Sequence, residues 1–137
     1  MPEYTSRLRG WLDRLGATGS FLCALHCALL PLLLGVLPGI GLASLLSRSF
    51  EEWFVLFATV LGVISLGWGF RRHRQPHALA LLLPGLAALW AGVWYVPLHE
   101  ATLPHALIMT LGGALVALAH VVNLRLTRFV AAHHAPA

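Results

Sequence analysis

The residues of this chain best suited to chemistry are two cysteines and a histidine inside one apolar stretch. Cys23 and Cys27 are the only cysteines in the sequence, and His26 lies between them in the run from Phe21 to Pro31. Thiols and imidazoles bind soft and borderline metal ions. Polar groups in a segment apolar enough to cross a bilayer are costly there, and they indicate function. The cluster therefore predicts a metal site.

The spacing of the two cysteines favours metal binding over a disulfide. Residues four apart on a helix have Cβ atoms about 5–6 Å from each other, whereas a disulfide needs about 3.5–4.5 Å. An ion between the two sulfurs can span the larger gap, and His26 falls on the adjacent flank of the helix. Pro31 leaves the carbonyl of Cys27 without its usual helical donor. We predict that Cys23, Cys27 and His26 form the metal site.

The charge balance favours a divalent ion that accepts two ligands. Two thiolates and one divalent cation sum to zero, and a neutral complex avoids most of the cost of a bare ion in lipid. Hg(II) meets this description. Zn(II) prefers four ligands, so it would need Cys23, His26, Cys27 and a further group such as His120 or water. Cu(I) with two thiolates would leave one negative charge uncompensated.

The composition indicates an integral membrane protein. Of the 137 residues, 58% are apolar and 10% are charged, and the mean hydropathy is +0.79, whereas a soluble domain is nearer a quarter charged. The net charge of +4 raises nucleic-acid binding as an alternative, but every basic residue is an arginine close to an apolar run. Membrane topology explains this pattern better, so no nucleic-acid partner is expected.

Four apolar runs predict four transmembrane helices, each near the ~20 residues that cross a bilayer. They cover approximately residues 16–37, 53–70, 78–97 and 104–124. Short connections favour an up-down-up-down bundle. Glycines such as Gly62, Gly67 and Gly112 are expected to let the helices approach closely. We predict an all-α, integral membrane four-helix bundle, with residues 1–137 forming a single multi-pass domain of the inner (plasma) membrane.

The arginines predict the orientation of this bundle. One side of it holds eight arginines and the other side holds only Arg48. Since short loops rich in arginine stay in the cytoplasm, both termini are expected to be cytoplasmic. The loops around Glu51 and Glu100 are then expected on the periplasmic side. The eight are Arg7, Arg9, Arg14, Arg71, Arg72, Arg74, Arg125 and Arg128.

Other polar residues are weaker candidates. His120 and Asn123 lie one turn apart in the fourth predicted span. They could act as a relay, support a metal ligand, or form a hydrogen bond between helices. His99, Glu100 and His105 bracket the turn between the third and fourth spans, where a metal ion could first dock, although the polarity of the interface also explains them. These residues therefore rank below the cysteine cluster.

At the cysteine cluster the chain resembles the MerC family of small four-span mercury-uptake proteins. The resemblance rests on the length, the four predicted spans, Gly19 and Ser20 before the cysteine pair, the proline after it, and a basic turn between spans two and three. It implies that Cys23 matches the first cysteine of the family's Cys-x-x-Cys pair, which binds Hg(II) arriving from the periplasm. It also implies a cytosolic metal acceptor such as mercuric reductase and no permanently bound cofactor, because the metal ion is the cargo.

The chain departs from the family pattern in two respects. His26 stands third after Cys23 and the second thiol follows at Cys27, which gives Cys-x-x-His-Cys, and residues 125–137 contain no cysteine. Zinc or copper transport or sensing at the same cluster therefore stays open. So do a membrane thiol-redox partner and a purely structural subunit. Catalysis is not expected, because no nucleophile is paired with a base at a suggestive spacing and Asp13 is the only aspartate.

Overall fold

All regular secondary structure in the described part of the chain is helical. The computed structural model describes residues 2–36 and 47–133, and within them the side chains of Cys23, Ala24, residues 26–36 and a few others are not described. The all-α prediction is confirmed for this part. The helices are α1 (Pro2–Val36), α2 (Arg48–His73), α3 (His77–Trp94), α4 (Val96–His99) and α5 (Thr102–His133).

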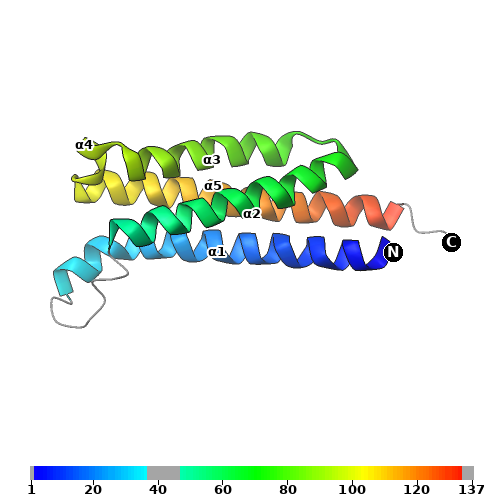
Figure 1. The fold of residues 1–137 in the computed structure, drawn as a ribbon, viewed down its shortest axis with the longest axis horizontal. Coiled ribbons are helices and arrows are strands. Elements are labelled where there is room, and N and C mark those ends of the chain that lie inside the picture. Colours follow the sequence, from blue (N-terminus) through cyan, green and yellow to red (C-terminus); the bar gives the residue numbers. More distant parts are fainter. Residues whose placement is uncertain (1, 37–46, 134–137) are drawn as a thin grey trace.

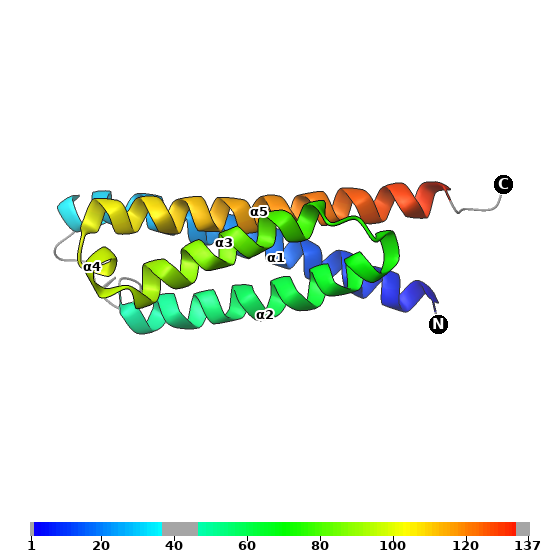
Figure 2. The same ribbon diagram turned by 90° about the horizontal axis from the view of Figure 1, so that it is seen from above.

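The four long helices run alternately up and down along one bundle axis (Figure 1). The first residues of α1 and the last residues of α5 lie at one end, which we call the arginine end. The start of α2 and the short helix α4 lie at the opposite end, as Figure 2 also shows. Helix α5 packs against α1, α2 and α3, and its most extensive contacts are with α1 and α3.

Local sequence signals explain where α2 begins and ends. The side chain of Ser47 caps its first turn by accepting a hydrogen bond from the backbone nitrogen of Phe50 at 3.3 Å. Glu51 in that first turn is favoured by the positive end of the helix dipole. The helix ends at His73 and is capped by Arg74, which has a left-handed backbone with φ of 50° and donates its backbone N–H to the carbonyl of Phe70. Pro76 is the N-cap residue of the next helix, which begins at His77.

Three of the four predicted spans overlap long apolar helices of the described structure. Three helices among the described residues are long and apolar enough to cross a membrane: Arg48–Arg72, His77–Trp94 and Leu103–Val130. The third predicted span, residues 78–97, is divided, because α3 ends at Trp94 and α4 follows with Pro97 near its start. The first predicted span, residues 16–37, ends outside the described residues and stays a prediction.

The helices pack through a core of small and branched apolar side chains from α2, α3 and α5, including Leu66, Leu82 and Val116. Many large apolar side chains, such as Leu83 and Leu111, are exposed. Lipid tails are as apolar as these side chains, so the helices associate through close packing and hydrogen bonds rather than through exclusion of water. The exposed apolar surface fits contact with lipid.

Helices α3 and α5 approach each other closely at Gly85 and Gly112. A Cβ at Gly112 would lie 2.9 Å from the carbonyl oxygen of Gly85, and a Cβ at Gly85 would lie 3.0 Å from the carbonyl oxygen of Gly112. A Cβ at Gly62 would likewise meet Leu82 at 2.9 Å. The predicted role in close packing is confirmed for Gly62 and Gly112. It is wrong for Gly67, which is exposed and has no atom within 4 Å of a Cβ position.

Candidate functional site

The three residues predicted to bind metal lie on the backbone of α1. Cys23, His26 and Cys27 all fall within this helix, which continues past Pro31 to Val36. Four residues along a helix make about one turn, so the backbone brings Cys23 and Cys27 one turn apart, as the sequence predicts. Their side chains are not among those that the structure describes. Ligation by these residues therefore stays a prediction.

A buried polar cluster joins three helices between the cysteine positions and the arginine end. It consists of Asp13 on α1, Ser65 on α2, and His120 and Asn123 on α5, and all four residues are buried. Asn123 donates from Nδ2 to Oδ1 and Oδ2 of Asp13 at 2.9 and 2.8 Å. Ser65 donates its hydroxyl to Oδ1 of Asp13. We call these residues the Asp13 cluster.

The same carboxylate also orients His120. The Nδ1 atom of His120 lies 3.4 Å from Oδ1 of Asp13. A carboxylate oxygen accepts and does not donate, so this contact is a hydrogen bond when the proton is on Nδ1. The other ring nitrogen, Nε2, is buried and has no hydrogen-bond partner among the described residues. The expected interhelical hydrogen bond of His120 is thus confirmed, and its partner is Asp13.

Two glycines make room for the cluster. A Cβ at Gly16 would lie 2.3 Å from the imidazole of His120, and a Cβ at Gly69 would lie 2.1 Å from the amide oxygen of Asn123. The two side chains are held by Asp13, so they cannot simply turn away. Gly16 on α1 and Gly69 on α2 are therefore required for α5 to place its polar residues between these helices.

His120 lies far from the level of the cysteines. It packs against Gly16, and Cys23 is seven residues further along α1, which corresponds to about 10 Å of helical rise. His120 also uses Nδ1 to bond Asp13. The suggestion that His120 completes a zinc site with Cys23, His26 and Cys27 does not fit this geometry.

Sequence reasoning missed Asp13 and Ser65 as partners in this cluster. Asp13 belongs to a segment that also contains Arg7, Arg9 and Arg14, and its partners are more than fifty positions away along the chain. One signal was present in the sequence: Asp13, Gly16 and Ser20 follow each other at intervals of three and four residues. This interval marks one face of a helix, and small or polar residues on such a face indicate close packing in a membrane protein.

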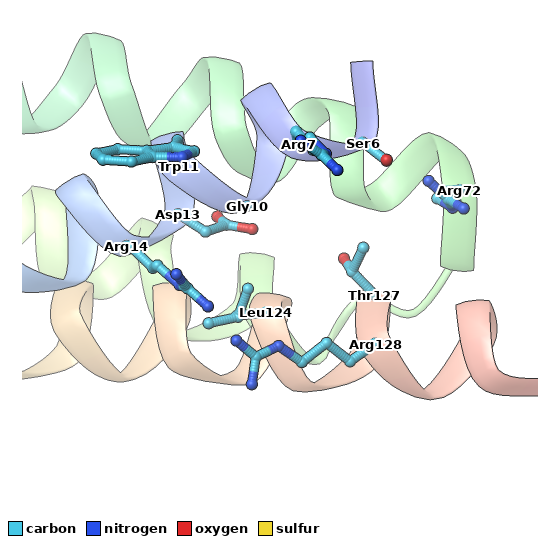
Figure 3. Close-up of a pocket in the computed structure, with 10 residues that line it drawn as sticks. All are labelled: Ser6, Arg7, Gly10, Trp11, Asp13, Arg14, Arg72, Leu124, Thr127 and Arg128. Carbon is cyan, nitrogen blue, oxygen red and sulfur yellow. The ribbon is translucent and has the colours of Figure 1, made fainter. Parts of the chain in front are cut away.

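A basic pocket of about 320 Å³ lies beside the Asp13 cluster at the arginine end. Its lining comes from α1, α2 and α5 and includes Arg7, Arg14, Arg72 and Arg128 (Figure 3). Figure 3 shows the carboxylate of Asp13 pointing into the space between α1 and α5. Four guanidinium groups around one opening create a positive potential, which attracts anions and acidic surfaces.

A second buried cluster lies at the opposite end of the bundle. It brings His99 and His105 together with Glu51, which follows the cap of α2. Glu100, the other candidate of that turn, is exposed. The two histidines were expected near a docking position for metal, whereas the participation of Glu51 was not expected, since it belongs to another helix.

The comparisons with known proteins give one match. A family model described as MerC mercury resistance protein matches residues 13–125. No curated protein and no solved structure matches the chain. The matched range begins at Asp13 and includes the cysteine pair, α2, α3 and most of α5.

Proposed function

The chain belongs to the MerC mercury resistance family, and from this membership we propose that it carries Hg(II) into the cytoplasm through the thiols of Cys23 and Cys27. The family implies membrane transport in mercury resistance, and the three long apolar helices fit a multi-pass membrane protein. The single observation that carries the proposal is the family match over residues 13–125, because that range includes both cysteines.

The helical register of α1 supports a position for the pair inside the bundle. The buried residues Asp13, Gly16 and Ser20 are three and four residues apart. Cys23 and Cys27 continue the same spacing, by three and then four residues. Positions at these intervals share one helix face. The two cysteine positions thus belong to the face of α1 that is buried against its neighbours closer to the arginine end.

The chemistry of the pair suits a soft divalent ion. On binding, each of the two thiols releases its proton to water and each sulfur forms a bond to Hg(II). The resulting complex has no net charge, so it avoids most of the penalty for moving a bare ion through lipid. His26 is the additional donor in the same turn, and we propose that it assists capture or release of the ion.

The direction of transport follows from the distribution of charge. We propose that the arginine end faces the cytoplasm, since arginine-rich ends are retained there, and that the opposite end receives the ion. A cytosolic acceptor such as mercuric reductase would then take the ion at the arginine end. The basic pocket beside Asp13 is suited to an acceptor with an acidic surface.

Uptake of radiolabelled Hg(II) tests the proposal in cells that lack mercuric reductase. Cells that express the protein should accumulate label faster than cells with an empty vector, and they should be more sensitive to Hg(II), because import is not followed by reduction. Cys23→Ser and Cys27→Ser should each return uptake to the level of the empty vector.

The matched control is Thr18→Ala, an exposed position on the same helix, which should leave uptake unchanged. Immunoblots of the membrane fraction must show equal amounts of each variant. If both serine variants take up Hg(II) like the unaltered protein, transport does not pass through these thiols and the proposal is wrong.

A further inference from the structure

The cluster at the end of the bundle opposite the arginine end consists of one carboxylate and two imidazoles from three helices. Glu51 is in the first turn of α2, His99 is the last residue of α4, and His105 is near the start of α5. The side chains of Glu51 and His105 are 4% exposed, and that of His99 is 24% exposed. The cluster is therefore built into the protein, with His99 at its rim.

The distances between the three side chains match those of metal ligands. The Oε2 atom of Glu51 lies 3.2 Å from Nε2 of His105 and 3.7 Å from Nδ1 of His99. One ligand atom from each residue lies within 4.8 Å of the other two. Tetrahedral ligands bound to zinc at about 2.0–2.1 Å are about 3.3 Å from one another. Small rotations of the side chains would bring all three within reach of one ion.

Several of these atoms are buried without the hydrogen bonds that burial demands. The Oε2 atom of Glu51, Nδ1 of His99 and Nδ1 of His105 have no hydrogen-bond partner among the described residues. Nδ1 of His99 is too far from Oε2, at 3.7 Å, to form a hydrogen bond with it. The contact of Oε2 with Nε2 of His105 at 3.2 Å is not a hydrogen bond either, because that nitrogen is hydrogen-bonded to Oε1 of Glu51 at 3.3 Å. A buried carboxylate oxygen without a donor is unfavourable. A cation between the side chains would satisfy it.

The ligand set selects the kind of ion. Two imidazoles and one carboxylate suit Zn(II) and similar divalent ions, whereas Hg(II) prefers thiolates. Zinc sites with three protein ligands keep a fourth position for water or another ligand, and the exposed edge of His99 leaves room for access from solvent. We propose that Glu51, His99 and His105 bind a zinc-class divalent cation, which joins the start of α2 to the connection between α3 and α5. This site does not depend on mercury transport.

Binding of Co(II) tests the site, because tetrahedral Co(II) has visible absorption bands that zinc lacks. The protein for this test is the full-length Cys23→Ser, Cys27→Ser double variant in detergent, since it contains no thiol. We expect one Co(II) per chain, a visible spectrum typical of tetrahedral coordination, and loss of that spectrum when Zn(II) displaces Co(II). Zn(II) should also raise the melting temperature by stabilising the folded state.

Substitutions in the cluster distinguish a metal site from a set of ion pairs without metal. Glu51→Gln and His99→Gln should each weaken Co(II) binding at least tenfold, and His99→Gln is the milder test of folding because its side chain is at the rim. Glu52→Gln, which alters the partly exposed neighbour of Glu51, should bind Co(II) normally. Elution as a single species from a sizing column confirms that each variant is folded.

Absence of Co(II) binding in the double variant, or unchanged binding after Glu51→Gln, would overturn the proposal. Neither result bears on uptake through the cysteines.

Discussion

Asn123 on α5 donates from one amide nitrogen to both carboxylate oxygens of Asp13 on α1, at 2.9 and 2.8 Å, although the two residues are 110 positions apart in the chain. This contact joins the first helix to the last one inside the bundle. The carboxylate also accepts from Ser65 on α2, so one side chain connects three helices. The free energy of this arrangement can be measured.

Replacing Asp13 should destabilise the bundle. Asp13→Ala leaves the buried donors of Asn123, Ser65 and His120 without their acceptor, which should lower the free energy of unfolding by about 1–3 kcal/mol. Asp13→Asn keeps the shape and one carbonyl acceptor, so its effect should be smaller. The measurement is loss of helical circular dichroism during titration of detergent micelles with sodium dodecyl sulfate. Glu3→Ala, at an exposed position of α1, is the control, and an equal loss in both alanine variants would contradict this role of Asp13.

Adding a methyl group beside the Asp13 cluster should lower the free energy of unfolding by about as much as Asp13→Ala does. Gly16→Ala and Gly69→Ala would push a Cβ into His120 and Asn123, and overpacking of this kind costs about 1–3 kcal/mol. Each has a matched control on the same helix, Gly10→Ala for α1 and Gly67→Ala for α2, where no atom lies within 4 Å of the new Cβ. The controls should be neutral or slightly stabilising, since alanine favours helix more than glycine does. If the two variants and their two controls unfold alike, the close contacts at these glycines do not contribute to stability.

A single added methyl group at the crossing of α3 and α5 should also destabilise the bundle. Gly112→Ala would place its Cβ 2.9 Å from the backbone oxygen of Gly85, and a backbone atom cannot rotate away. The two helices must then separate, at a cost of about 1–3 kcal/mol. Ala114→Gly, at an exposed position two residues later, tests helix propensity alone. The same micelle titration applies, and stability of Gly112→Ala at or above that of the unaltered protein would count against close packing at this crossing.

The orientation of the protein can be tested with single cysteines in the thiol-free double serine variant. Glu100→Cys, at the end with α4, should react in intact cells with a maleimide that cannot cross membranes. Gln75→Cys, in the connection after α2, should react only after the membrane is opened, because the arginine end is expected in the cytoplasm. Both positions are exposed, so reactivity reports sidedness. The reverse pattern would invert the proposed direction of transport.

The sequence predicted the long apolar helices well and their ends less well. Hydropathy marks the part of a helix that lies in lipid, so the prediction for α2 stopped at Phe70, whereas the helix continues through Arg71 and Arg72 to His73. The division of the third span into α3 and α4 was missed, because α4 (Val96–His99) begins with apolar residues like those of α3. The position of Pro104 in the first turn of α5 was predicted correctly, since proline fits there.

The buried polar contacts were the part that sequence reasoning could not supply. His120 and Asn123 were recognised as unusual because they interrupt an apolar run, but nothing in the chain identifies their partner. Asp13 lies before the apolar run and resembles an exposed residue in a charged segment. Pairing between helices depends on which faces meet, and that depends on close contacts such as those of Gly16 and Gly69.

Helix α5 carries residues of both buried clusters, with His105 in one and His120 in the other. Fifteen residues of helix hold these two side chains about 22 Å apart along one rigid rod. A slide of α5 by a single turn, about 5.4 Å, would break the contacts of both clusters together. The two clusters together therefore fix the position of α5 along the bundle axis.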